Sequence, residues 1–217
     1  MAERLVIRMT DITDHLRLVQ WLSPGFPIGS FAYSQGLETA ITARAVHDLP
    51  GLQGWISQIL TTGSARTDAI LLAHTRKGAD VRDLALALAS SAERQTEMME
   101  QGRAFGQTIA AITGTPQPLL PYALAVGHAT RLLSVTTADV LTHFLMGAAS
   151  QLTSVGVRLI PLGQTNGQRL LASLTPLIAD LAPRYSTLPL SAIGTATLGA
   201  DLAAMQHETL DIRLYRT

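Results

Sequence analysis

The chain has 217 residues, enough for one large domain with a substantial core. Its formal net charge is zero, so it lacks the basic excess that binding to nucleic acid requires. The absence of cysteine excludes disulfides and thiolate metal sites, and the low charged fraction of 15% predicts that some apolar surface contacts a partner.

The amino-terminal residues carry charges at short intervals, among them Glu3, Arg4 and Arg8. A secretory signal peptide needs an apolar run at this position, so we expect a cytoplasmic protein. We also expect residues 1–11 to form a flexible arm. Two later stretches are uncharged. Prolines interrupt the first of them, and polar side chains occur throughout the second, residues 140–157, so we expect no membrane span.

Apolar residues recur at helical spacing along most of the chain, as in the set Ile12, Leu16 and Val19. No stretch alternates between apolar and polar residues for long enough to predict a strand. The pattern predicts a single all-α domain, a bundle of about nine or ten helices. Pro176 is expected to kink or end the penultimate helix. The expected helices cover residues 12–22, 30–46, 49–62, 65–77, 80–90, 91–113, 121–133, 137–155, 164–181 and 194–208.

Residues 23–38, SPGFPIGSFAYSQGLE, concentrate glycine, proline and aromatic residues in a stretch that follows the first expected helix and runs into the second. The glycines suggest a phosphate-binding loop, but a Walker A motif needs a lysine, and the only lysine, Lys77, lies elsewhere. We therefore interpret the segment as a tight entry into helix 30–46. Ser34 and Glu38 share one face of that helix, which is the expected docking surface.

A charged strip follows the helical spacing between residues 91 and 113. Strips of this kind are usually solvated faces, and each ion pair in them contributes little to stability. We therefore expect this strip to be exposed to solvent. Its members are Glu93, Arg94, Glu97, Glu100 and Arg103.

The common catalytic and metal-binding motifs do not occur in the sequence. No serine stands in the G-x-S-x-G frame of a hydrolase, and Asp211 occupies the position of the second histidine in the H-E-x-x-H zinc motif. The histidines include no pair three or four residues apart, so no resident metal ion is expected. A small helical hydrolase using Glu38, His128 and Arg158 is an alternative, although no spacing places a nucleophile beside a base.

Two later segments are rich in polar residues. Residues 156–171 leave one helix at Pro161 and start the next with Gln164 and Gln168, side chains that suit a tight helix–helix corner. Residues 207–217 end in arginine and aromatic residues, which are enriched at the centres of protein interfaces. The final segment is therefore either a partner anchor or a frayed tail.

Four motifs occur in order along the chain. Their residues are Ser23-Pro24, Pro27, Gly29, Phe31, Tyr33-Ser34 and Gly36-Leu37-Glu38; Glu97 with Gly102-Arg103; Arg158 to Gln164 with Gly167-Gln168; and His207-Glu208 with Arg213 to Arg216. These motifs resemble those of the urease accessory protein UreF family. The resemblance runs from about Leu18 to the last residue, although the chain ends Leu-Tyr-Arg-Thr where the family more often has Leu-Phe-Arg-Ser.

The resemblance implies an all-helical homodimer without enzymatic activity of its own. Family members bind the accessory protein UreD, called UreH in some organisms, and the GTPase UreG, and the assembly delivers nickel to apo-urease. Nickel would pass through the complex, so no cofactor is expected to stay bound. The element that docks on UreD falls on residues 207–217, with 209–217 as the docking tail. A generic helical adaptor of another complex is a further alternative.

The expected partner-binding residues come from the motif segments and the tail. The set consists of Tyr33, Ser34, Glu38, Arg158, Gln164, Gln168, His207, Arg213, Leu214, Tyr215 and Arg216.

Overall fold

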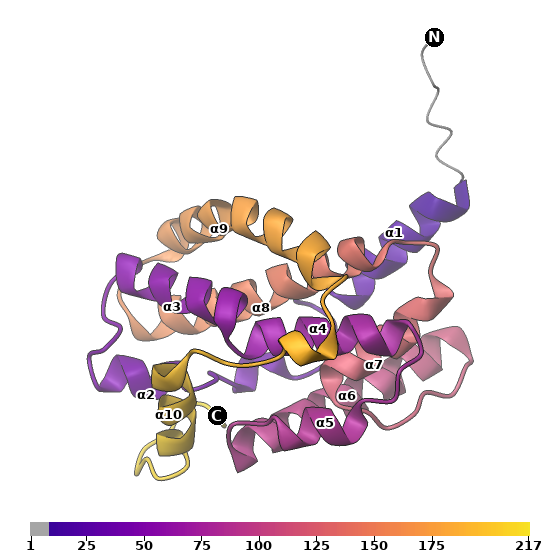
Figure 1. The fold of residues 1–217 in the computed structure, drawn as a ribbon. Coiled ribbons are helices and arrows are strands. Elements are labelled where there is room, and N and C mark those ends of the chain that lie inside the picture. Colours follow the sequence, from indigo (N-terminus) through magenta and orange to yellow (C-terminus); the bar gives the residue numbers. More distant parts are fainter. Residues whose placement is uncertain (1–8) are drawn as a thin grey trace.

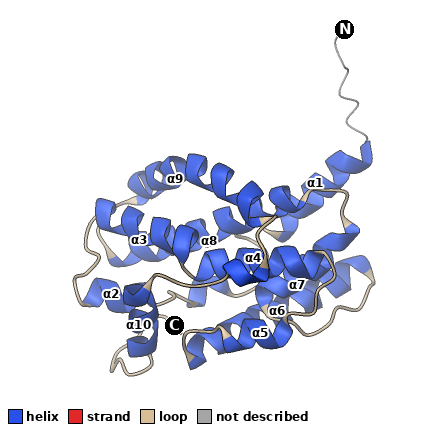
Figure 2. Ribbon diagram, in the orientation of Figure 1, coloured by secondary structure: helices blue, strands red, loops and turns tan. Residues whose placement is uncertain are grey.

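The computed structural model describes residues 9–217, and its regular elements in that range are all helical (Figure 2). The predicted all-α single domain is confirmed. The α-helices are α1 (Met9–Trp21), α2 (Leu37–Thr42), α3 (Leu49–Thr62), α4 (Ser64–Arg76), α5 (Arg82–Ala87), α6 (Ala92–Thr113), α7 (Tyr122–Ala129), α8 (Thr137–Leu159), α9 (Gln164–Tyr185) and α10 (Leu198–His207). Three short 3₁₀ helices are η1 (Ser30–Ala32), η2 (Thr130–Leu132) and η3 (Leu190–Ala192).

Helix α8 is the central element of the bundle. It begins at a capping box, in which the Asp139 amide donates to Thr136 Oγ1 over 3.1 Å and the Thr136 amide donates to Asp139 Oδ2 over 3.0 Å. Helices α1, α2, α3, α4 and α9 all pack against it. It is the one described helix long and apolar enough to cross a membrane, but these neighbours on several sides are those of a core helix.

A row of aromatic rings crosses the core between the loop after α1 and helix α8. Phe105 of α6 is fully buried in this row. Beside it α6 meets the segment before α7 so closely that a Cβ on Gly102 would lie 2.0 Å from the carbonyl oxygen of Leu120. Successive ring centroids are 5.3, 5.7 and 5.8 Å apart along Phe26, Phe105, Tyr122 and Phe144.

The expected helix over residues 30–46 is wrong. Only Leu37–Thr42 is α-helical, and Tyr33 before it has an extended backbone with φ −123° and ψ 131°. Gln35 and Gly36 have φ values of 53° and 78°, and this left-handed geometry cannot continue a right-handed helix. Helical spacing alone did not reveal this turn, because the apolar residues on either side of it happen to share a helical period.

The turn before α2 is required by the contact between α2 and α10. A Cβ on Gly36 would lie 2.6 Å from the backbone nitrogen of Ala204, so the residue has to be glycine for α10 to pack there. Figure 1 shows α2 and α10 side by side, with the carboxy terminus next to them. Ser34 and Glu38, expected on an exposed helix face, are both buried at this contact.

Helix α1 turns its apolar stripe outward. Ile12, Leu16 and Val19 follow helical spacing as predicted, but all three are exposed, whereas Leu18 and Trp21 are buried. Residues 9–11, which the sequence placed in an amino-terminal arm, belong to this helix. Residues 1–8 of the expected arm lie outside the described residues.

Helix α9 continues past both of its prolines. It runs to Tyr185 and is not ended by Pro176, and its ribbon is curved in Figure 1. A proline inside a helix removes one backbone hydrogen bond, but here an apolar face on both sides of Pro176 packs against α8 and holds the helix together. The buried residues of that face are Leu170, Leu174, Ile178 and Leu181.

Candidate functional site

The carboxy-terminal segment, residues 208–217, folds back onto the body of the protein, and we call it the tail. The Arg216 amide donates a hydrogen bond to the Ala32 carbonyl over 2.7 Å. The Ser34 amide donates to the Thr217 carbonyl oxygen over 2.8 Å, and Thr217 is almost fully buried. The tail is therefore packed against the segment between η1 and α2 rather than frayed.

Glu38 holds the backbone of the tail. Its carboxylate lies in the first turn of α2, is buried, and accepts the Leu214 amide at Oε1 over 2.8 Å and the Tyr215 amide at Oε2 over 3.0 Å. Hydrogen bonds to a charged acceptor are stronger than those between neutral groups. Two successive amides on one carboxylate therefore fix both the position and the direction of the tail.

His207 connects Glu38 to helix α6. The side chain is fully buried at the end of α10, with Nε2 3.0 Å from Glu38 Oε2 and Nδ1 2.7 Å from Glu93 Oε2. We call Glu38, His207 and Glu93 the triad. The other oxygen of Glu93 accepts a hydrogen bond from Arg213 Nη1 over 2.6 Å, so the tail is bonded to both carboxylates of the triad.

A second set of contacts holds the end of the tail. Arg216 Nη1 lies 2.7 Å from Glu100 Oε2, and the Tyr33 hydroxyl donates to the same oxygen over 2.5 Å. Hydrogen bonds from Tyr33 and Arg216 lower the pKa of Glu100, while burial and the Glu100 carboxylate raise the pKa of Tyr33. The guanidinium groups of Arg216 and Arg158 lie 5.4 and 5.9 Å from the ring centroids of Tyr33 and Tyr215.

Most of the sequence-predicted site residues meet at the tail, which is the cluster just described. Gln164 and Gln168 do not. They are exposed in the first turns of α9, where they line a polar groove of about 200 Å³ together with Phe31 and residues of α8. The residues that meet at the tail are Tyr33, Ser34, Glu38, Arg158, His207, Arg213, Leu214, Tyr215 and Arg216.

The charged strip on α6 is largely not the solvated face that we expected. Glu93 and Glu100 bind the tail, Glu97 is fully buried, and the Arg94 guanidinium is nearly so. Only Arg103 is exposed as predicted. The only sequence signal for this arrangement was a carboxylate at every third or fourth position of α6. The basic tail residues that pair with these carboxylates lie more than a hundred positions away in the sequence, so the pairing could not be predicted.

A buried ion network supports the floor of the tail site. Arg94 Nη2 lies 2.5 Å from Asp68 Oδ2 on α4, and Arg94 Nη1 lies 2.7 Å from Glu97 Oε2. Glu97 Oε1 accepts hydrogen bonds of 3.0 Å from Gln35 and from Gln101. Burial raises the pKa of Asp68, and the Arg94 charge opposes that shift. The network joins α4 and α6 to the turn that carries the tail.

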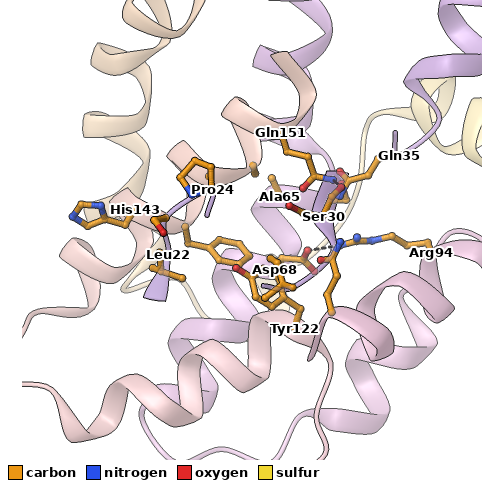
Figure 3. A pocket seen from close by; sticks show the side chains of 17 residues that line it. Leu22, Pro24, Ser30, Gln35, Ala65, Asp68, Arg94, Tyr122, His143 and Gln151 are labelled. Carbon is orange, nitrogen blue, oxygen red and sulfur yellow. Dashed lines mark hydrogen bonds and ion pairs between the residues drawn. The ribbon is translucent and has the colours of Figure 1, made fainter. Parts of the chain in front are cut away.

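Figure 3 shows the cavity next to this ion network. It has a volume of about 60 Å³ and is lined by polar groups, including Asp68, Arg94 and Gln151, as well as apolar side chains of the loop after α1 and of α8. A dashed line in Figure 3 marks the contact between Asp68 and Arg94, which both line the cavity. Within the described part of the chain, no group of three or more His, Asp or Glu side chains is placed to hold a metal ion.

The residues of the alternative hydrolase site are not brought together. Glu38 and Arg158 both approach Tyr215, but His128 lies on α7, with Nδ1 3.2 Å from Oε1 of Gln117. Burial lowers the pKa of His128, but no hydroxyl nucleophile is paired with it. The geometry does not favour this alternative.

Comparison with known proteins agrees with the resemblance seen in the motifs. The family model UreF matches residues 46–175, more than half of the chain. The chain belongs to the UreF family. Proteins named urease accessory protein UreF are 51% identical to it in Cereibacter sphaeroides, over 93% of this chain and 98% of the relative. The identity is 44% in Dinoroseobacter shibae, over 95% and 100%, and 42% in Paracoccus denitrificans, over 96% and 100%.

The match to the UreF family model covers one side of the tail site. It includes Glu93, Glu100 and Arg158, which receive the tail, but it ends before the tail itself. The full-length relatives extend the similarity over more than nine-tenths of this UreF-family chain.

Proposed function

We propose that this UreF-family chain is a non-enzymatic scaffold for the maturation of urease. It binds UreD (UreH) and the GTPase UreG and supports GTP-dependent insertion of nickel into apo-urease. Nickel is the cargo of the assembly and is not a resident cofactor of this chain. The absence of a Walker A motif from the sequence fits a division of labour in which a partner hydrolyses the nucleotide.

The observation that carries the proposal is the exposure of apolar side chains on an anchored tail. The side chain of Ile212 is 84% exposed and that of Leu214 is 73% exposed. The tail backbone beside them is nevertheless held in place, because the Leu214 amide donates to the Glu38 carboxylate. Exposed apolar side chains that form a patch mark interaction sites. A backbone that is already ordered loses less entropy on binding, which favours affinity. We assign the UreD contact to this tail.

Helix α10 leads into the tail and adds apolar surface. Leu198, Leu202 and Met205 are exposed at i, i+4 and i+7, so they lie along one face of the helix. The exposed stripe of α1 gives the chain another apolar surface, which supports the proposed homodimer. We further propose that the protein works in the cytoplasm, where it contacts neither membrane nor nucleic acid.

The test is to replace Leu214 by glutamine in the otherwise complete chain. The side chain is exposed, so Leu214→Gln leaves the Glu38 contact to its backbone in place. We expect at least tenfold weaker co-purification with UreD and a lower nickel content of co-expressed urease. Leu132→Gln is the matched control, because Leu132 is 62% exposed on η2, away from the tail. Equal UreD binding by both variants would overturn the assignment of the tail.

A further inference from the structure

With Glu38 and Glu93 ionised, the geometry of the triad is satisfied only by a doubly protonated imidazole. Both ring nitrogens of His207 lie within 3.0 Å of a carboxylate oxygen, from Glu38 on one side and Glu93 on the other. Ionised carboxylates only accept hydrogen bonds, and a neutral imidazole has a single N–H to donate. We propose that the triad is a proton-operated clasp, which holds the tail closed while His207 is protonated and releases it when that proton is lost.

The charges around His207 balance only in the protonated state. Glu38 faces it from α2 and Glu93 from α6, while Arg213 of the tail neutralises the outer oxygen of Glu93. On α10 itself the next residue, Glu208, is directed to the Ala92 amide at the start of α6. Tyr215 of the tail is bonded to Glu38 through its backbone, and the guanidinium of Arg158 of α8 lies over the Tyr215 ring.

Loss of the proton places a nitrogen lone pair against a carboxylate oxygen. His207 is fully buried, so water cannot replace the missing hydrogen bond without an opening of the site. The favourable contact is therefore complete while His207 is protonated and both carboxylates are ionised, and it is lost with the imidazole proton.

The tail responds because both carboxylates of the triad also hold it. Glu38 Oε2 accepts from His207 and from the Tyr215 amide, and Glu93 accepts from His207 and from Arg213. Ile212 and Leu214 point to solvent and contribute little packing that would keep the tail in place. Movement of either carboxylate therefore weakens the attachment of the tail.

A nitroxide spin label tests the clasp on the isolated chain. The sequence contains no cysteine, so Leu214→Cys provides a single labelling position on the tail. We expect the ratio of mobile to immobile label to rise between pH 6 and pH 9, by up to about tenfold per pH unit, the limit for one linked proton. The same spectrum at both pH values would overturn the proposal.

Two variants of the labelled protein assign the pH response to the triad. In Glu93→Gln the amide can donate to the free nitrogen of a neutral His207, so we expect the label to stay immobile across the whole range. Glu100→Gln is the matched control, since Glu100 lies on the same helix and binds the tail through Arg216, and it should keep the wild-type pH response. A pH response that persists in Glu93→Gln, or disappears in Glu100→Gln, would contradict the assignment.

The consequence for partner binding rests on the proposed function. If the tail is the UreD contact, opening of the clasp changes the affinity for UreD with the same pH dependence. The two claims are tested separately. The spin-label experiment contains no partner and therefore tests only the clasp, whereas the Leu214→Gln binding experiment tests only the assignment of the tail to UreD.

Discussion

The aromatic core and the tail site are held together in different ways. In the core, Phe105 is fully buried in a row of rings that meet in tilted and edge-on contacts, and many apolar contacts share the stabilisation. At the tail, Glu38, Glu93 and Glu100 bind residues 213–216 through short hydrogen bonds and ion pairs. The chain thus combines a packed body with a tail whose attachment depends on a few atoms.

The two regions also differ in how they respond to solution conditions. Apolar packing has no group that titrates, whereas the tail contacts depend on the charge of carboxylates and one imidazole. Substitution in the core is expected to change the stability of the whole domain. Substitution at the tail is expected to change mainly the local opening of residues 208–217.

The largest effect is expected from Phe105→Ala in the core. Removing a fully buried ring should lower the free energy of unfolding by about 3–5 kcal/mol, measured by chemical denaturation. Phe31→Ala is the matched control, because Phe31 is more than half exposed on η1 and should change stability little. Similar losses in the two variants would mean that the row of rings is not the centre of the core.

An intermediate effect is expected from Glu38→Gln at the tail. The amide group of glutamine cannot accept all three donors that Glu38 now accepts, from His207, Leu214 and Tyr215. Each hydrogen bond to a charged group contributes about 1.5–3 kcal/mol, so its loss should make hydrogen exchange of the tail amides at least tenfold faster. Asp211→Asn, an exposed carboxylate in the same segment, serves as control. Unchanged exchange in Glu38→Gln would remove Glu38 as the anchor.

The smallest effect is expected at Glu100 in acid. Hydrogen bonds from Tyr33 and Arg216 lower its pKa, so its contact contributes at neutral pH and is lost as the pH falls through the lowered value. Glu100 is partly exposed, and solvent screening keeps the contribution small. Wild type and Glu100→Gln should differ in tail exchange at pH 6 and become equal near pH 3. A difference that persists in acid would contradict this assignment.

Much of the fold followed from local patterns in the sequence. The apolar spacing predicted the long helices α3, α4, α6, α8 and α9 because they are long enough for the period to repeat. It failed at Tyr33 and Gly36, where the left-handed turn depends on the close approach of α10. The helix that the sequence placed at residues 164–181 continues to Tyr185, because packing against α8 outweighs the local preference of a proline to end it.

The candidate site was predictable in its residue types but not in its arrangement. Motif resemblance identified Glu38, His207 and the tail, yet it did not indicate that Glu38 binds the tail of the same chain. Glu93 was missed for the same reason, since its spacing fits an exposed strip equally well. Burial of a charged side chain is decided by what packs over it, and that information is absent from the local sequence.

The sequence by itself determined the helical class, the lack of a phosphate-binding loop and the membership of the UreF family, because these depend on residue types and their spacing. Only the tertiary structure decided which charges are buried and which apolar residues are exposed. His207 meets Glu38 across 169 positions and Glu93 across 114 positions of the chain. Contacts over such separations form only when the helices pack, and they join the triad to the tail.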